Sequence, residues 1–200
     1  MLLGVSPAQA AYLFLFVSLA GFVGRFVFSR LSEVIGRRAA GALQGFGNGA
    51  MIIEAGLLHD SFIGTVSVFW LLIIAADFFF DGGSAIMGPY AAEVWPSALR
   101  TSGMGSAYGF GGIGKIIGPI GLALIVGSSN IVKPDVTIAA ILPCFLYLAA
   151  WSALAGFAYA FIGFETKRRS IEDIDRGLTD GRPQLAGRVP VQRAVGDRQV

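Results

Sequence analysis

The sequence has few charged residues, a single cysteine and a single histidine. Only 14% of its 200 residues are Asp, Glu, Lys or Arg, whereas 54% are hydrophobic. Soluble domains carry about 25% charged residues, so a soluble protein of this composition would lack polar surface. The chain is therefore expected to be an integral membrane protein whose first partner is the lipid bilayer.

The scarcity of reactive side chains excludes several functions. Cys144 and His59 stand alone, so an intrachain disulfide, a CxxC metal site and a catalytic triad are not available. Gly109–Lys115 resembles a phosphate-binding loop, but Ile116 replaces the Ser or Thr that would hold magnesium, and no strand precedes it. A net charge of +2 is too small to indicate a nucleic-acid partner. We expect no enzymatic activity, cofactor or metal site.

Long stretches without charge are abundant instead. Residues 1–24 and 136–164 contain no Asp, Glu, Lys or Arg, and a helix of roughly 20 residues crosses a hydrocarbon core of about 30 Å. Helices are favoured over barrel strands because a helix satisfies its own backbone hydrogen bonds within lipid. We predict an all-α membrane bundle over residues 1–164, with five transmembrane helices close to residues 8–28, 39–58, 62–91, 102–127 and 136–163.

Positive charges mark one side of this bundle. Thirteen of the 15 Lys and Arg residues fall in three places, which are the segment from Arg25 to Arg38, Arg100, and residues 165–200; Lys115 lies within a span and Lys133 on the opposite side. By the positive-inside rule the first side is cytoplasmic. We therefore expect a multi-pass protein of the plasma membrane, the inner membrane in a bacterial cell, with its N-terminus outside and its C-terminus inside.

Residues 165–200 differ sharply from the apolar bundle. Ser170 is a suitable N-cap for a short surface helix that ends near Leu178. The residues after it are rich in Pro, Gly and Arg. We predict a cytoplasmic tail with one short helix followed by a disordered end.

Three charged segments on the cytoplasmic side carry recognisable motifs. Residues 30–38 read RLSEVIGRR after Gly24-Arg25, residues 90–103 read YAAEVWPSALRTSG, and residues 164–174 read FETKRRSIEDI. They resemble, in order and spacing, the G-R-L-S-D-R-x-G-R-R, Y-x-x-E-x-x-P-x-x-x-R and P-E-T-K-G-R-S-L-E-E-I motifs of the major facilitator superfamily. The likeness is strongest to its sugar-porter and metabolite:proton symporter branches. Val34 and Phe164 depart from the family pattern, which usually has Arg and Pro there.

This resemblance implies a position within a larger fold. In the superfamily the third motif follows helix twelve, so the five predicted spans would correspond to helices eight to twelve, and the first seven would be absent from this chain. The implied function is proton-coupled transport of a small organic metabolite by alternating access, which needs two repeat halves. The missing N-terminal half would then be a partner. The alternative is a membrane scaffold or assembly partner that derives from a transporter half and does not transport.

Four charged residues on the cytoplasmic side are candidates for a gate. Arg37 and Arg38 begin one predicted helix, Glu93 ends another, and Arg100 precedes a third. Ion pairs among them would lie at the membrane surface, where they can break and reform. The resemblance implies that such a latch closes the inner gate in one state. The alternative for the two arginines at positions 37 and 38 is static anchoring to the membrane.

Asp77, Asp81 and Lys115 lie within predicted spans, where ionisable groups are costly and often functional. Asp77 and Asp81 share a helix face. Asp77 and Lys115 would both lie about 20 Å from the cytoplasmic helix ends, so an ion pair between them is possible. Two acids and one base leave an acid that could carry a proton. In the related family stretch R-x-G-G-x-x-G-P, the position of the Arg is occupied here by Gly112. Lys115, one helical turn later, would supply a positive charge instead and would suit an anionic solute such as a carboxylate. The alternative is that Asp77 and Lys115 form a purely structural ion pair.

Overall fold

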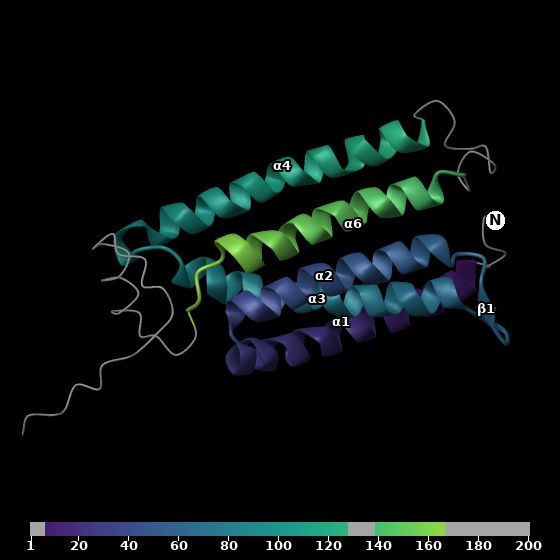
Figure 1. The fold of residues 1–200 in the computed structure, drawn as a ribbon, viewed down its shortest axis with the longest axis horizontal. Helices are drawn as coiled ribbons and strands as arrows, with labels where there is room; N and C mark the ends of the chain where they lie inside the picture. The colour runs from purple at the N-terminus through teal and green to yellow at the C-terminus, as the bar shows by residue number, and fades with distance from the viewer. Residues whose placement is uncertain (1–6, 128–138, 167–200) are drawn as a thin grey trace, which may run out of the picture.

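The computed structural model describes residues 7–127 and 139–166. Within these ranges the chain forms five long helices (Figure 1). Their bounds are α1 (Pro7–Ile35), α2 (Arg37–Leu57), α3 (Val68–Glu93), α4 (Arg100–Val126) and α6 (Ile141–Phe157), the last continued by a π-helical turn, η2 (Ala158–Ile162). A 3₁₀ turn, η1 (Ser97–Leu99), precedes α4. The predicted tail beyond residue 166 lies outside the described residues.

Four of these helices are long and apolar enough to cross a membrane: α1, α3, α4 with η1, and α6 with η2. The remaining long helix, α2, is less apolar because it carries Arg37, Arg38, Gln44, Asn48 and Glu54. It nevertheless has 21 residues and lies between α3 and α6, with which it makes extensive contact. The chain is thus an all-α membrane protein, as the sequence predicted.

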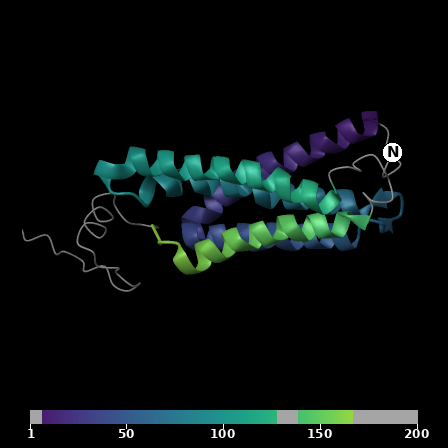
Figure 2. The ribbon, with the colours of Figure 1, turned by 90° about the horizontal axis from the view of Figure 1, so that it is seen from above.

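The helices run alternately between two ends of the molecule (Figure 1). One end holds the α1–α2 junction, the α3–α4 connection and the end of η2; the other holds the start of α1, the α2–α3 connection and the end of α4. Helix α1 packs on α3, α3 on α2, and α2 on α6, whereas α4 touches α3 and α6 over a smaller area. Seen from above, the first turns of α1 lean away from the other helices (Figure 2).

The third helix begins later than predicted. Residues 62–67 were expected within a span, but Phe62–Ile63 (β1) pairs antiparallel with Val66–Ser67 (β2). Gly64, at φ 63°, allows the tight turn between the two strands. The apolar composition of this segment therefore reflects an exposed hairpin, and the helix starts at Val68.

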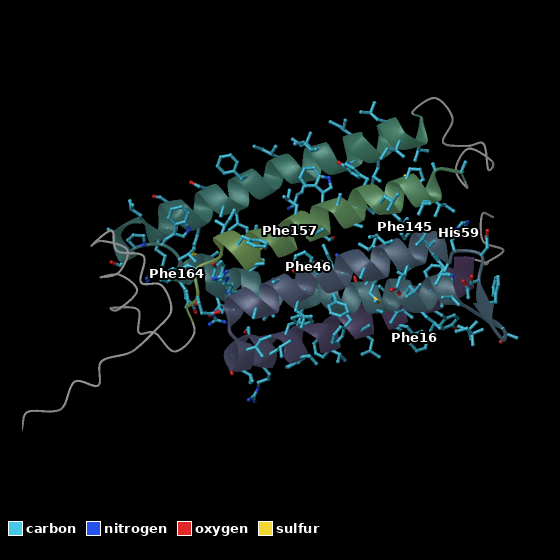
Figure 3. All side chains as sticks on the ribbon, viewed as in Figure 1. Phe16, Phe46, His59, Phe145, Phe157 and Phe164 are labelled. Atoms are coloured by element: carbon cyan, nitrogen blue, oxygen red, sulfur yellow. The ribbon has the colours of Figure 1, made fainter. Side chains whose placement is uncertain are left out.

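Aromatic side chains and glycines hold the packed helices together. Phe46 of α2 meets Phe157 of α6 edge to face, with ring centroids 4.9 Å apart (Figure 3). Asn48 of α2 donates a hydrogen bond to Ser152 of α6 over 2.9 Å. A Cβ atom on Gly45 would lie 2.5 Å from the Cα of Gly156, so the two backbones are in direct contact there.

Candidate functional site

The junction between α1 and α2 is shaped by Gly36. This residue has φ 101°, a conformation that side chains disfavour, and it lets the chain reverse within one residue. The space beside it is filled by Glu165, whose carboxyl carbon would lie 2.8 Å from a Cβ on Gly36. The same carboxylate accepts a hydrogen bond from the Arg37 backbone N–H over 3.1 Å. The start of α2 is thereby attached to the segment after η2.

Arg37 and Glu93 form a bidentate ion pair at this end of the bundle. Nε of Arg37 donates to Oε2 of Glu93 and Nη2 donates to Oε1, both over 2.6 Å. The Thr166 hydroxyl donates to Oε2 of Glu93 over 2.5 Å. The two charged side chains retain only 21% and 24% of their exposure, so the pair is more strongly coupled than a fully solvated one.

Tyr90 links the segment after η2 to the apolar core of the bundle. The Tyr90 hydroxyl accepts a hydrogen bond from the Phe164 backbone N–H over 2.6 Å, and its ring lies 5.4 Å from that of Tyr159. Both rings pack on a core of Phe28, Ala40 and Ile86. Residues from α1, α2, α3 and η2 therefore pack together at the end of the bundle that holds the ion pair.

The other two predicted gate residues do not bind Glu93. Arg38 donates from Nε to the carbonyl oxygen of Ala160 over 3.0 Å and also contacts it through Nη2. Arg100, at the start of α4, has a buried Nε without a hydrogen-bond partner in the described part of the chain. Of the three arginines considered, only Arg37 is in position to pair with Glu93.

The charged residues deeper in the bundle pair differently from the prediction. Asp81 of α3 accepts a hydrogen bond from Nη2 of Arg25 on α1 over 2.9 Å. A Cβ atom on Gly21 would lie 2.5 Å from Oδ2 of Asp77 and 2.7 Å from Oδ2 of Asp81. Glycine at position 21 thus leaves room for both carboxylates, which face the same part of α1.

Lys115 does not join this cluster. It is exposed on α4, and no ion pair within the described residues links it to Asp77 or Asp81. The partner of Asp81 is instead Arg25, which the sequence analysis assigned to the cluster of positive charges expected on the cytoplasmic side. Since α1 extends to Ile35, Arg25 lies about 15 Å from that end of the helix, well inside a segment long and apolar enough to span a membrane.

Comparison with known proteins agrees with the motifs and with the helical architecture. A family model described as "Sugar (and other) transporter" matches residues 2–178, a range that includes all three motif segments. The chain belongs to this family. It is a family of membrane transporters of the major facilitator type and not of enzymes, in agreement with the sequence-based expectation.

Curated relatives of this sugar-transporter family member include the synaptic vesicle 2-related proteins of Rattus norvegicus and Bos taurus. The rat protein is 31% identical over 110 residues, which is 54% of this chain and 18% of the relative. The bovine protein is 31% identical over 106 residues, 52% of this chain and 17% of the relative. The chain therefore spans less than a fifth of the length of these relatives. No solved structure shows a significant match.

The structure also adds residues that the sequence analysis did not assign to a site. Glu165 and Thr166 belong to the third family motif, and that membership was the signal that could have placed them beside Glu93. Arg25 follows Gly24 in the first motif, but its sequence neighbours gave no sign that it points towards α3. The position of Arg25 depends on how far α1 continues and on which way that helix is rotated.

Proposed function

We propose that this chain is the C-terminal part, helices eight to twelve, of a proton-coupled transporter that moves a small organic metabolite by alternating access. The solute class that suits its intramembrane cations is an anion such as a carboxylate. The orientation proposed is the one that the positive charges indicate, with the N-terminus outside and the C-terminus in the cytoplasm of the plasma membrane.

The observation that carries this proposal is the Arg37–Glu93 ion pair with its two ties to the segment after η2. It joins α2, α3 and residues 165–166 at one end of the bundle. A partly buried pair at a membrane surface is strong enough to hold helix ends together and weak enough to open within a transport cycle. This is the behaviour expected of an inner gate. Arg38 and Arg100 lie at the same end of the bundle and would assist that gate.

The partial nature of the chain is supported by the surface of α4. Gly105, Gly109, Gly112, Gly114 and Gly118 have open space where a Cβ would be. Glycines of α1 and α2, and Gly82 and Gly83 of α3, lie close to side chains or backbone of neighbouring helices instead. Small residues along a membrane helix favour close approach of another helix. We infer that the missing N-terminal half covers this face. The same surface suits the alternative function, a non-transporting assembly partner.

The gate is tested by Glu93→Gln in the transporter that contains this chain. We expect uptake into proteoliposomes to fall by about 5- to 30-fold, because loss of a charge partner in a partly buried pair costs on the order of 1 to 2 kcal/mol. Asp60→Asn is the matched control, since Asp60 lies at the opposite end of the bundle and its side chain is 86% exposed. Unchanged uptake by the Glu93 variant would remove the gate, and a protein that transports nothing under any gradient would favour the assembly partner.

A further inference from the structure

The connection between α2 and α3 exposes apolar side chains at the end of the bundle that also holds the start of α1. In the hairpin β1–β2, Phe62 is 66% exposed, Ile63 67% and Val66 49%. Ile63 pairs with Val66 across the turn, and side chains alternate between faces along a strand. Ile63 and Val66 therefore lie on one face of the hairpin and Phe62 on the other, so both faces present exposed apolar groups.

The hairpin is held in a fixed direction by backbone hydrogen bonds at its base. The N–H of Leu58 donates to the Glu54 carbonyl over 2.8 Å, and the N–H of Ser61 donates to the Leu58 carbonyl over 3.0 Å. The N–H of Val68 then donates to the Ser61 carbonyl over 3.0 Å. Figure 1 shows that the helices run along the molecule, whereas the hairpin is turned across their direction. Because the helices cross the bilayer, an element turned across them lies along the membrane surface.

Aromatic residues place this end of the bundle at the level of the membrane interface. The Trp70 ring, in the first turn of α3, meets the Phe14 ring of α1 edge to face with centroids 6.0 Å apart. Tyr12, near the start of α1, is 69% exposed. Tyr and Trp are enriched where the hydrocarbon meets the headgroups. The hairpin is therefore continuous with a membrane-spanning helix at the depth of the headgroups.

The composition of the hairpin suits lipid on both of its faces. Residues 61–76 contain no Asp, Glu, Lys or Arg, so the apolar surface of the hairpin continues into the membrane-spanning part of α3. A partner protein on one face would leave the other face in water, whereas lipid surrounds both. Deep burial in hydrocarbon is unfavourable, because the sheet within the described residues has two strands, and its outer edges would leave backbone N–H and C=O groups unsatisfied there.

We propose that the β1–β2 hairpin is a membrane-interface anchor, and that its apolar side chains insert between the headgroups and upper acyl chains of the leaflet next to the start of α3. Interfacial elements enter about 5 to 10 Å into this boundary. Residues 39–99 contain no Lys or Arg, so the apolar side chains provide the binding, and attraction to anionic lipid does not. The anchor goes beyond the proposed transport function and holds for either orientation of the chain in the membrane.

The depth of the hairpin is measured by the quenching of a fluorophore by spin-labelled lipid. Ile63→Cys or Val66→Cys, each in the full chain with Cys144→Ala, is labelled with bimane and reconstituted into phosphatidylcholine vesicles. The lipid carries a nitroxide either near the top or at the end of its acyl chain. We expect the nitroxide near the top to quench both labels more strongly. It should quench them about threefold more than a label on Asp60→Cys, the 86% exposed control in the same connection.

Removing apolar surface tests whether these side chains hold the hairpin in lipid. Phe62→Ser should reduce the quenching of the Val66→Cys label by about twofold, because interfacial binding scales with the buried apolar area. Thr65→Ser is the matched control at a neighbouring exposed position, and it should leave the quenching unchanged. Anionic phosphatidylglycerol in the vesicles should have no effect on any of these variants.

Three results would overturn the anchor. Stronger quenching from the end of the acyl chain would place the hairpin in the hydrocarbon. Absence of lipid quenching at both labelled positions would leave the hairpin in water, where its apolar faces are free for another protein. Equal quenching of the Ile63→Cys and Asp60→Cys labels would show that the hairpin is no deeper than its polar base. None of these results bears on transport, which is measured separately as uptake.

Discussion

At the scale of single residues, the most informative feature is how few side chains contact the Glu93 carboxylate. Glu93 accepts from Arg37 and from Thr166, and Thr166 is only 5% exposed. A partly buried carboxylate oxygen that loses a donor is less well satisfied, which is more unfavourable than the loss of a fully solvated hydrogen bond. The Thr166 hydroxyl is therefore expected to stabilise the ion pair as well as the chain segment that carries it.

Thr166→Val tests this contribution, because valine keeps the shape and removes the hydroxyl. We expect the free energy of unfolding in detergent to fall by about 1 kcal/mol. Thr101→Val, at an exposed threonine at the start of α4, should leave it unchanged. A stability loss of equal size in both variants would show that the hydroxyl of Thr166 has no special role.

At the scale of helices, the space beside each glycine shows which helix surfaces are tightly packed and which are open. Gly45 brings α2 onto the backbone of α6, with Ser152 O 2.8 Å from where its Cβ would lie. Backbone atoms cannot move aside as a flexible side chain can. Gly109 of α4 has nothing within 4 Å at the same place, so the two glycines have opposite packing environments within one chain.

Gly45→Ala should therefore destabilise the chain by about 1 to 3 kcal/mol, the usual effect of added volume in a packed interior. Gly109→Ala should have no such effect in the isolated chain. The measurement is thermal or denaturant unfolding of both variants in the same detergent. If Gly45→Ala is tolerated as well as Gly109→Ala, the α2–α6 contact is looser than the structure indicates.

At the scale of the whole molecule, successive helices run in opposite directions, so the bundle has two ends that we expect on opposite sides of the membrane. The end with Arg37 and Glu93 is expected in the cytoplasm, and the end with the β1–β2 hairpin outside. Glu33 is exposed at the first end and Asp60 at the second. Ser32, in contrast, is only 2% exposed and would be a poor labelling site at the same end.

Cysteines introduced at Glu33 and Asp60, in a chain with Cys144→Ala, report the orientation. We expect a membrane-impermeant maleimide to label the Asp60→Cys variant in intact cells. The Glu33→Cys variant should be labelled only after the membrane has been opened. The reverse pattern would invert the topology, and the assignment of Arg37 and Glu93 to an inner gate would fail with it.

The helical fold and the family could be predicted because they depend on properties local to each segment. A charge-free run such as residues 141–157 satisfies its own backbone hydrogen bonds in lipid when it forms a helix. The motif at residues 90–103 likewise placed Glu93 at a helix end, where the structure has it. The hairpin at residues 62–67 was missed because an apolar strand and an apolar helix end have the same composition.

Apart from the hairpin at residues 62–67, the amino-acid sequence by itself determined where the long helices lie. It also determined that Glu93 would have an arginine within reach, because both features follow from composition and from motifs that include their own spacing. Only the tertiary structure decided which arginine that is, and that Asp81 pairs with Arg25 while Lys115 lies apart. Depth along a helix can be counted from residue numbers. Partnership depends on helix rotation and on which helices are neighbours, and these arise from packing at positions such as Gly21 and Gly45.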